Sequence, residues 1–328
     1  MIITKTPLRL PLGGGGTDLP FFYPKFGGEL VTACLSKYVY VTVSERKFVD
    51  RFRISYSKTE NVKTIAEIEN NRVREALKLL NITRPLEIAT ISEVPGSSGL
   101  GSSSAFLVGL LKALHAYKGE SVSSKTLAEE AAHIEINILK EPIGKQDQYA
   151  AALGGVNHLK INKEGTVAAS PINLSYNTLR DLEVNLHLFF TGITRDATDV
   201  LKEQSKSVLG DNEKLNCMNQ IKQIGLDIKE SLENGDTKRF GKLMNLHWET
   251  KKKTSSSMSN QKIDRWYDIA IKNGALGGKI MGAGGGGFFV FYCNNNSSDF
   301  IHTMEKEGLQ SVPFHFDMDG SKILLDAR

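Results

Sequence analysis

The segment PGSSGLGSSSAF at 95–106 places a loop of glycines and serines between a strand-like stretch and a helix-like one. Alternating apolar residues at 86–91 predict the strand, and apolar residues recurring every three or four positions over 102–117 predict the helix. Glycines let a backbone approach a ligand closely, and the first turn of a helix offers unpaired N–H groups to an anion. The segment therefore favours a phosphate-binding turn, and a serine-capped surface loop is the alternative.

Two further glycine clusters lie at 13–16 and 282–287. Neither they nor the central loop match the better-known nucleotide motifs. A Walker loop needs a lysine and a hydroxyl residue after its glycines, which 95–105 lacks. The GxGxxG spacing of dinucleotide-binding folds occurs within 282–287, but it precedes a predicted strand instead of opening a helix. The HRD and DFG sequences of protein kinases are also missing.

The order of predicted elements favours an α+β fold. Besides 86–91, strands are predicted at 37–43, 51–56, 185–191, 286–293 and 312–316. Helices are predicted over 102–117 and 124–140 and in several stretches before residue 272. A chain of 328 residues allows two domains of roughly 150 residues. We place the boundary near 180–195, which gives domains 1–185 and 186–328.

The composition excludes several function classes. A net charge of +4 is too small to indicate a nucleic-acid partner, and we expect the short basic run at 251–253 to be a solvated helix face. No apolar run approaches the ~20 residues of a membrane span, so we expect no membrane partner. Three cysteines in wide spacing favour a reducing, cytoplasmic location. The expected partner is a small molecule, and monomer and homodimer both remain open.

Three segments together resemble the motifs of the GHMP kinases, which include galactokinase, homoserine kinase and mevalonate kinase. They are TPLRLPLGGGGTD at 6–18, PGSSGLGSSSA at 95–105 and KIMGAGGGGFFVFY at 279–292, and they occur in the family's order. The resemblance implies the two-domain GHMP kinase fold, with an N-terminal ATP-binding domain like ribosomal protein S5 domain 2 and a ferredoxin-like C-terminal domain. It implies ATP and Mg²⁺ as cofactors.

The same resemblance implies the residues of catalysis. Asp147, in IGKQDQ, matches the aspartate that contacts the acceptor hydroxyl, and Arg9 matches the arginine that offsets charge in the transition state. A helix-capping aspartate and a structural ion pair are the alternatives. The ATP-binding residues implied by the second motif are Pro95, Gly96, Ser97, Ser98, Gly99, Leu100, Gly101, Ser102, Ser103 and Ser104.

A metal site is implied at Ser103 and Glu135. The spacing of Glu135 from Ala131 and Ile138 puts its carboxylate on the apolar side of a predicted helix. A carboxylate there is costly unless it is paired or bound to a cation. A partly exposed glutamate at the helix edge is the alternative.

The first motif carries GGGTD where galactokinase has a charged GEHTD. Together with TGITRDATDVLKEQ at 191–204, it is most similar to the bacterial heptose 7-phosphate kinases of the family. This implies phosphorylation of the anomeric hydroxyl of D-glycero-D-manno-heptose 7-phosphate, on the way to GDP-heptose for surface glycans. A kinase for fucose or galactose and a non-catalytic sugar-binding regulator are the alternatives. The implied substrate-binding residues are Gly15, Gly16, Thr17, Asp18, Gly284 and Gly285, with Arg195 as the candidate for the 7-phosphate.

Overall fold

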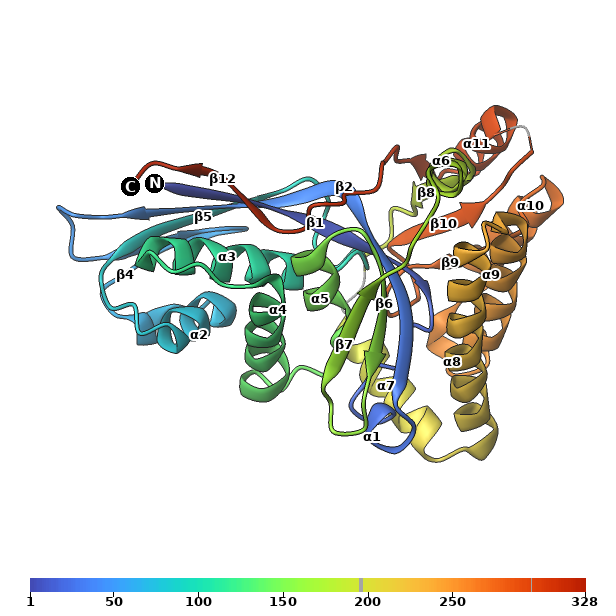
Figure 1. Ribbon diagram of the computed structural model, residues 1–328, viewed down its shortest axis with the longest axis horizontal. Coiled ribbons are helices and arrows are strands. Elements are labelled where there is room, and N and C mark those ends of the chain that lie inside the picture. Colours follow the sequence, from blue (N-terminus) through green and yellow to red (C-terminus); the bar gives the residue numbers. More distant parts are fainter. Residues whose placement is uncertain (195–196, 296) are drawn as a thin grey trace.

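A computed structural model describes residues 1–194, 197–295 and 297–328. Its described strands form two β-sheets, one built mainly from the first half of the chain and one from the second (Figure 1). Strands and helices are mixed without regular alternation, so the predicted α+β class is confirmed.

The first sheet is organised around two long strands, β1 (Ile2–Gly13) and β2 (Gly28–Glu45). One end of β2 pairs with β5 and the other end pairs with β6, so this strand joins two parts of the sheet. The strand order is β12-β1-β2-β5-β3-β4, with β6 and β7 branching from β2. The other strands are β3 (Phe52–Ser55), β4 (Thr59–Val62), β5 (Leu86–Ser92), β6 (Val156–Ile161), β7 (Val167–Pro171) and β12 (Lys322–Asp326).

Helix α3 (Ser102–Lys118) packs across β1 and β2 and carries the longest buried face of the first half. Gly109 lets the helix approach the sheet, since a Cβ there would lie 2.6 Å from the hydroxyl oxygen of Thr6. Next to α3 lie α2 (Asn71–Leu79), α4 (Ser124–Ala132) and α5 (Gln146–Leu153). The helix predicted over 124–140 is confirmed in position, although its second part, His133–Ile138, is a π-helical turn.

The second sheet is antiparallel and has the strand order β11-β8-β10-β9. Its strands are β8 (Leu186–Phe190), β9 (Gly277–Ile280), β10 (Phe288–Tyr292) and β11 (Gln310–Ser311). The fourth strand lies beside the first and the third beside the second, which is the ferredoxin-like order that the family resemblance implies. The helices in the second half of the chain are α6 (Tyr176–Asn185), α7 (Ala197–Leu209), α8 (Asn212–Glu233), α9 (Thr237–Lys252), α10 (Gln261–Lys272) and α11 (Ser297–Lys306). The short elements are α1 (Tyr23–Phe26) and the 3₁₀ turns Ile65–Glu67 and Ser256–Met258.

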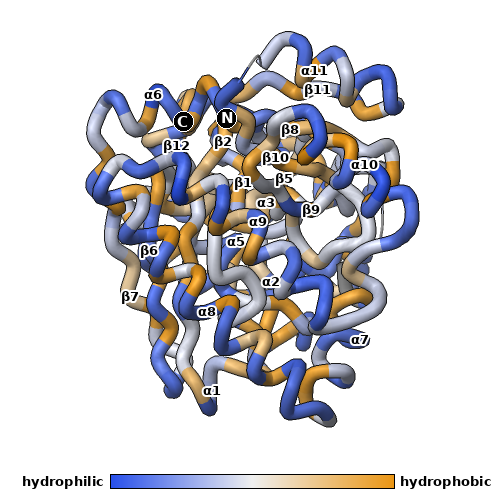
Figure 2. The backbone as a smooth tube through the Cα atoms, turned by 90° about the vertical axis from the view of Figure 1, so that its right-hand side faces the viewer, coloured by the Kyte–Doolittle hydropathy of each residue, from blue (hydrophilic) through white to orange (hydrophobic). Residues whose placement is uncertain are grey.

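Aromatic side chains hold α9 and α10 against this sheet. Trp248 and Tyr267 pack on Phe289, whose ring centroid lies 4.3 Å from that of Phe291. All four side chains are buried, and aromatic contacts of this kind contribute beyond the area that they bury. Figure 2 shows the apolar strands near the middle of the molecule and hydrophilic stretches in outer elements such as α7 and α11.

Several strands differ from the sequence predictions, and two of them have a clear physical reason. The strand predicted at 312–316 is wrong, because the strand is β11 at 310–311 and Phe316 makes a single bridge to Leu35. Pro313 has no N–H for a ladder, which explains the end of the strand. Conversely, β1 has no counterpart among the predicted strands, and it contains Pro7 and Pro11, which are unusual in a strand. The structure accommodates both prolines where the pairing with β2 shifts register.

The two halves share a broad interface. Helix α8 of the second half packs on β1 and β2, where a Cβ on Gly225 would lie 3.0 Å from the Cα of Gly14. The last strand, β12, returns to pair with β1, and the terminal amine of Met1 donates to the carbonyl of Ala327 at 3.0 Å, so both termini lie together (Figure 1). Residues 322–326 thus complete the first sheet, and the domain division after residue 185 stays a prediction. Within the described residues, no helix has the length and apolar character needed to cross a membrane.

Candidate active site

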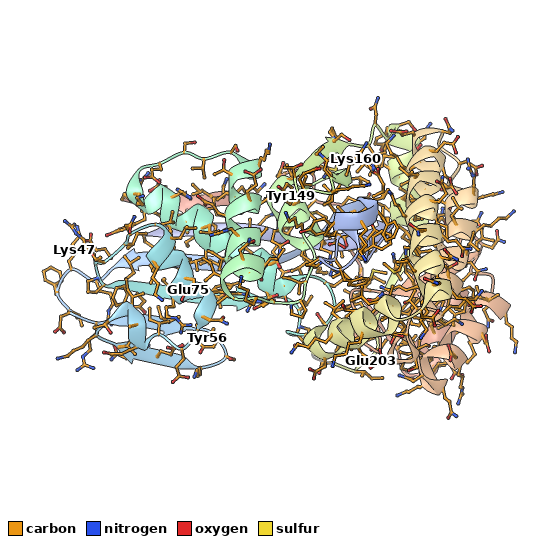
Figure 3. The ribbon with its side chains drawn as sticks, turned by 90° about the horizontal axis from the view of Figure 1, so that it is seen from below. Lys47, Tyr56, Glu75, Tyr149, Lys160 and Glu203 are labelled. Atoms are coloured by element: carbon orange, nitrogen blue, oxygen red, sulfur yellow. The ribbon has the colours of Figure 1, made fainter. Side chains whose placement is uncertain are left out.

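A cavity of about 850 Å³ lies between the two halves of the chain. Figure 3 labels Tyr56, which lines the cavity from the first half of the chain. It also labels Glu203 on α7, the residue before Gln204, which lines the cavity from the second half. All three glycine-rich segments reach its wall. Lining residues used below are Arg9, Gly15, Gly16, Asp18, Arg72, Gly96, Ser97, Ser98, Gly99, Gly101, Ser102, Ser103, Ser104, Glu141, Gly144, Asp147, Lys251, Lys279, Gly282 and Ala283.

Arg9 of β1 and Asp147 of α5 form a two-point ion pair at this wall. Nε of Arg9 donates to Oδ1 of Asp147 at 2.7 Å, and Nη2 donates to Oδ2 at 3.0 Å. Nη1 of the same guanidinium donates to the carbonyl oxygen of Gly99. A guanidinium held at three points is fixed in orientation, and the carboxylate that it holds is 27% exposed on the cavity side. The two predicted catalytic residues are therefore brought together.

The predicted ATP loop runs into the N-terminus of α3. Positive φ angles at Ser97, Gly99 and Gly101 (55°, 84° and 75°) fold it back on itself. The hydroxyl of Ser98 is buried on the cavity wall without a hydrogen-bond partner among the described residues. Together with the free N–H groups and positive dipole end of a 17-residue helix, the loop forms a cradle suited to phosphate oxygens. Pro95 and Leu100 lie outside the cavity lining, and Leu100 is buried beneath the loop.

The third glycine segment packs directly on this loop. A Cβ on Gly282 would lie 2.9 Å from the Cα of Gly99, and the N–H of Phe288 donates to the carbonyl of Ser98 at 3.2 Å. The structure places Gly282 and Ala283 at the cavity, whereas the predicted substrate residues Gly284 and Gly285 contact Met258 instead. The glycines are needed here for close backbone packing.

The first glycine segment brings Asp18 to the cavity. This carboxylate is 5% exposed and accepts a hydrogen bond from the N–H of Gln146 at 3.0 Å. Burial raises the pKa of Asp18, and the Gln146 N–H opposes that rise. Gly144 makes room for it, because a Cβ there would lie 1.9 Å from Oδ2. Asp18 is thus bound to the backbone of Gln146, the residue that precedes Asp147.

The other members of this predicted substrate set divide into two groups. Gly15 and Gly16 line the cavity. Thr17 does not, because its hydroxyl lies beneath the turn and donates to the carbonyl of Gly14 at 2.8 Å. Arg195 lies outside the described residues.

Of the predicted metal ligands Ser103 and Glu135, only Ser103 lines the cavity. Ser103 is exposed at the cavity. Glu135 is fully buried, and its carboxylate accepts from Arg72 at 2.9 Å, from Ser104 at 2.7 Å and from Gln148 at 2.6 Å. The predicted burial on the apolar side of the helix is confirmed, and its charge is compensated by an arginine.

Two lysines at the cavity were not predicted as site residues. The expectation of a solvated helix face at 251–253 is wrong for Lys251, which is 6% exposed and donates from Nζ to the carbonyl of Gly282 at 2.8 Å. Lys279, just before the third glycine segment, is 2% exposed. Burial, followed by the positive charge of Arg9, lowers the pKa of Lys251 to about 8. Lys279 lies in the short strand β9 at the start of the third motif, and its neighbours in the sequence gave no signal for a cavity residue.

Comparison with known proteins settles the family. The profile of the GHMP kinases N terminal domain matches residues 60–155, and that of the GHMP kinases C terminal domain matches 228–306. The chain is 34% identical to the D-glycero-alpha-D-manno-heptose 7-phosphate kinase of Campylobacter jejuni, over 98% of both chains. The chain belongs to the GHMP kinases. Its membership makes it an ATP-dependent kinase and confirms the family that the three motifs implied.

Solved GHMP kinases have the same fold. A structure described as a D-glycero-D-manno-heptose 1-phosphate kinase from Bacteroides thetaiotaomicron superposes with a TM-score of 0.83 at 25% identity, over the whole of both chains. The galactose complex of Lactococcus lactis galactokinase superposes with a TM-score of 0.76 at 18% identity, over 98% of this chain and 94% of that one. The second likeness concerns the fold alone.

Proposed function

We propose that this GHMP kinase transfers the terminal phosphoryl group of ATP to the anomeric hydroxyl of D-glycero-D-manno-heptose 7-phosphate and forms the 1,7-bisphosphate. The full-length similarity to the C. jejuni kinase carries the proposal. The B. thetaiotaomicron relative also bears the name of a heptose phosphate kinase, although that name gives the 1-phosphate. In this proposal the product leads to GDP-heptose for surface glycans.

The geometry supports phosphoryl transfer at the Arg9–Asp147 pair. Asp147 has a carboxylate oriented toward the cavity, where it can accept a hydrogen bond from the acceptor hydroxyl and take its proton as the new P–O bond forms. Arg9 fixes that carboxylate and places positive charge beside the reacting oxygens, which stabilises the transition state. Asp18, with one N–H already bound, can accept hydrogen bonds from sugar hydroxyls.

The loop at 97–104 supports the nucleotide end of the reaction. Its backbone N–H groups and the unpartnered hydroxyl of Ser98 (unpartnered among the described residues) are donors suited to the β- and γ-phosphates. Phosphoryl transfer depends mainly on positioning and charge stabilisation, both of which a rigid loop packed under Gly282 can supply.

Magnesium fits the present arrangement only in part. The cation usually keeps several waters and binds nucleotide phosphates together with one or two protein oxygens. Ser103 can supply one of these. Glu135 does not fit as a ligand while Arg72, Ser104 and Gln148 hold its two oxygens. The described residues hold no group of three or more histidine, cysteine or acidic side chains arranged for a metal. We therefore propose Ser103 as the protein ligand.

A coupled ADP-release assay with a panel of acceptors tests the proposal. The panel contains heptose 7-phosphate, heptose 1-phosphate, unphosphorylated heptose, fucose, galactose and mevalonate. We expect kcat/KM to be highest for heptose 7-phosphate, with the new phosphate on the anomeric carbon by ³¹P–¹H correlation. If kcat/KM is highest for fucose or galactose, the proposed acceptor is wrong and the kinase activity stands. If none of these acceptors leads to ADP release, the result would favour the non-catalytic regulator.

A further inference from the structure

The second half of the chain contributes two buried lysines to the cavity wall, Lys251 near the end of α9 and Lys279 in β9. Helix α9 packs against β9, and Figure 1 shows the two elements side by side. Both ammonium groups belong to side chains that are at least 94% buried, and both residues line the same cavity as Arg9 and Asp147. Buried lysines are rare unless a partner compensates the charge.

Lys279 lacks such a partner within the described part of the chain. Its ammonium group donates no hydrogen bond there and forms no ion pair. Burial lowers its pKa well below the usual value, and the positive charges of Lys251 and Arg9 lower it further. His247, one turn before Lys251, does not help, because burial and the same lysines keep this fully buried imidazole neutral. An ammonium group aimed into a cavity under these conditions points to an anionic ligand.

The neighbouring charges leave a positive excess. Arg9 is committed to Asp147, and Lys251 is bonded to a neutral carbonyl, that of Gly282. Asp18 interacts electrostatically with Lys251, but burial raises the pKa of its own carboxyl. Once Lys279 is protonated, it joins Arg9 and Lys251 as a third cation against the two carboxylates of Asp147 and Asp18. A phosphate monoester dianion would balance the set, and lysine ammonium groups bind phosphate as compact point charges.

Position favours the acceptor's phosphate over those of the nucleotide. The nucleotide phosphates have their own cradle at 97–104 and the N-terminus of α3. Lys251 interacts instead with Asp18, which is the candidate for the sugar hydroxyls. Its hydrogen bond to Gly282 places Lys251 where the third glycine segment packs on Gly99 of the phosphate loop, so Lys251 lies between the nucleotide cradle and Asp18. We propose that Lys251 and Lys279 form the subsite for the phosphate group that the acceptor sugar carries, an inference that rests on the proposed function.

The test compares two acceptors in the full-length enzyme, heptose 7-phosphate and unphosphorylated heptose. The readout is the ratio of their kcat/KM values. Lys279→Met and Lys251→Met remove the charge and keep most of the side-chain volume, and Lys253→Met is the matched control on the exposed side of the same basic run. We expect each cavity variant to lower the ratio at least tenfold, which corresponds to about 1.4 kcal/mol. The control should keep the wild-type ratio.

Two results would overturn the assignment. A ratio that stays at the wild-type value in both variants would show that the lysines do not read the acceptor's phosphate. An equal loss of kcat with both acceptors, together with weaker binding of a non-hydrolysable ATP analogue, would place the lysines at the transferred phosphoryl group or the nucleotide.

A binding measurement separates this inference from the proposed function. If the wild type does not use heptose 7-phosphate, inorganic phosphate becomes the probe, and thermal unfolding is followed as phosphate is added. A phosphate-dependent rise in the melting temperature of the wild type that is absent from Lys279→Met would support the phosphate subsite. Equal rises in the wild type and in Lys279→Met would contradict it. Without phosphate, the variant should melt about 2 °C or more above the wild type, because the cost of burying an amine that has no partner among the described residues is gone. A lower melting temperature would indicate a structural lysine and overturn the assignment.

Discussion

Arg9 and Asp147 stand 138 residues apart in the chain, yet Nε and Nη2 of the arginine bind the two carboxylate oxygens of the aspartate at 2.7 and 3.0 Å. The pair couples the first strand of the fold to the first turn of α5. It also ties both to the phosphate loop, because Arg9 donates from Nη1 to the carbonyl of Gly99 and from its backbone N–H to the carbonyl of Leu100. The first two motifs of the family and the segment that carries Asp147 thus meet around one guanidinium.

The first prediction concerns Asp147→Asn. The amide keeps the shape of the side chain but can no longer take a proton, so kcat should fall by about 10²–10⁴-fold. Binding of a non-hydrolysable ATP analogue should change little, since the nucleotide cradle belongs to a different segment. Turnover measured under saturating substrate checks the first point and calorimetric titration checks the second. Wild-type kcat would remove Asp147 from catalysis.

The second prediction concerns the space beside that pair. A Cβ at position 101 would lie 2.9 Å from Oδ2 of Asp147 and 3.1 Å from Cγ of Arg9, and Gly101 has a φ of 75°. Gly101→Ala should therefore lower the free energy of unfolding by about 1–3 kcal/mol, from backbone strain and displacement of the pair. A shift of the pair by about 1 Å should reduce kcat by roughly 10²-fold.

Gly96→Ala is the matched control for stability. It lies in the same loop, and no described atom lies within 4 Å of a Cβ there. Its free energy of unfolding, from urea titration, should equal or slightly exceed that of the wild type. If both alanine variants lose the same stability, the loop is generally intolerant and the specific contact at Gly101 is not the cause.

The third prediction uses pH and Lys251. Burial, followed by the charge of Arg9, lowers the pKa of Lys251 from 10.5 to about 8, while Asp18 opposes the change. Between a pH of about 8 and 10.5 this lysine binds more protons in the unfolded chain than in the folded protein. The free energy of unfolding therefore rises with pH across this range, and the gain is lost as pH falls toward 8. Urea titrations at pH 8, 9 and 10 should show the wild type gaining about 1–3 kcal/mol relative to Lys251→Met. Parallel stability curves for the two proteins would contradict the low pKa.

The fourth prediction distinguishes two roles of Glu135. Because its carboxylate accepts from Arg72 in the interior, Glu135→Gln should lower the free energy of unfolding by about 1–3 kcal/mol. Arg72 keeps a second partner, Glu141 at 2.6 Å, which limits the loss. The magnesium concentration for half-maximal rate should stay at the wild-type value if Glu135 holds Arg72 alone. A several-fold increase in this magnesium concentration, measured on a folded variant, would instead show that Glu135 is a metal ligand.

The features that depend on local pattern could be predicted from the amino-acid sequence. The alternating run at 86–91, the periodic helix from Ser102 and the glycines before it were read from spacing alone, because side-chain period and backbone freedom are local properties. The resemblance of three ordered motifs then indicated the family, and with it Arg9 and Asp147. These residues lie together in the fold as expected.

How the buried charges are compensated became visible in the folded chain. Neither the burial of Lys251 nor the lack of a partner for Lys279 among the described residues follows from the sequences KKK and KIM, because the free-energy cost of burying a lysine depends on what surrounds it after folding. In the same way, Glu135 was recognised as a carboxylate in need of a cation, but its partner Arg72 comes from α2, 63 residues away. Strand β1, with its two prolines, forms because β2 and β12 pair with it on either side, and such pairing is a property of the assembled sheet and not of the segment.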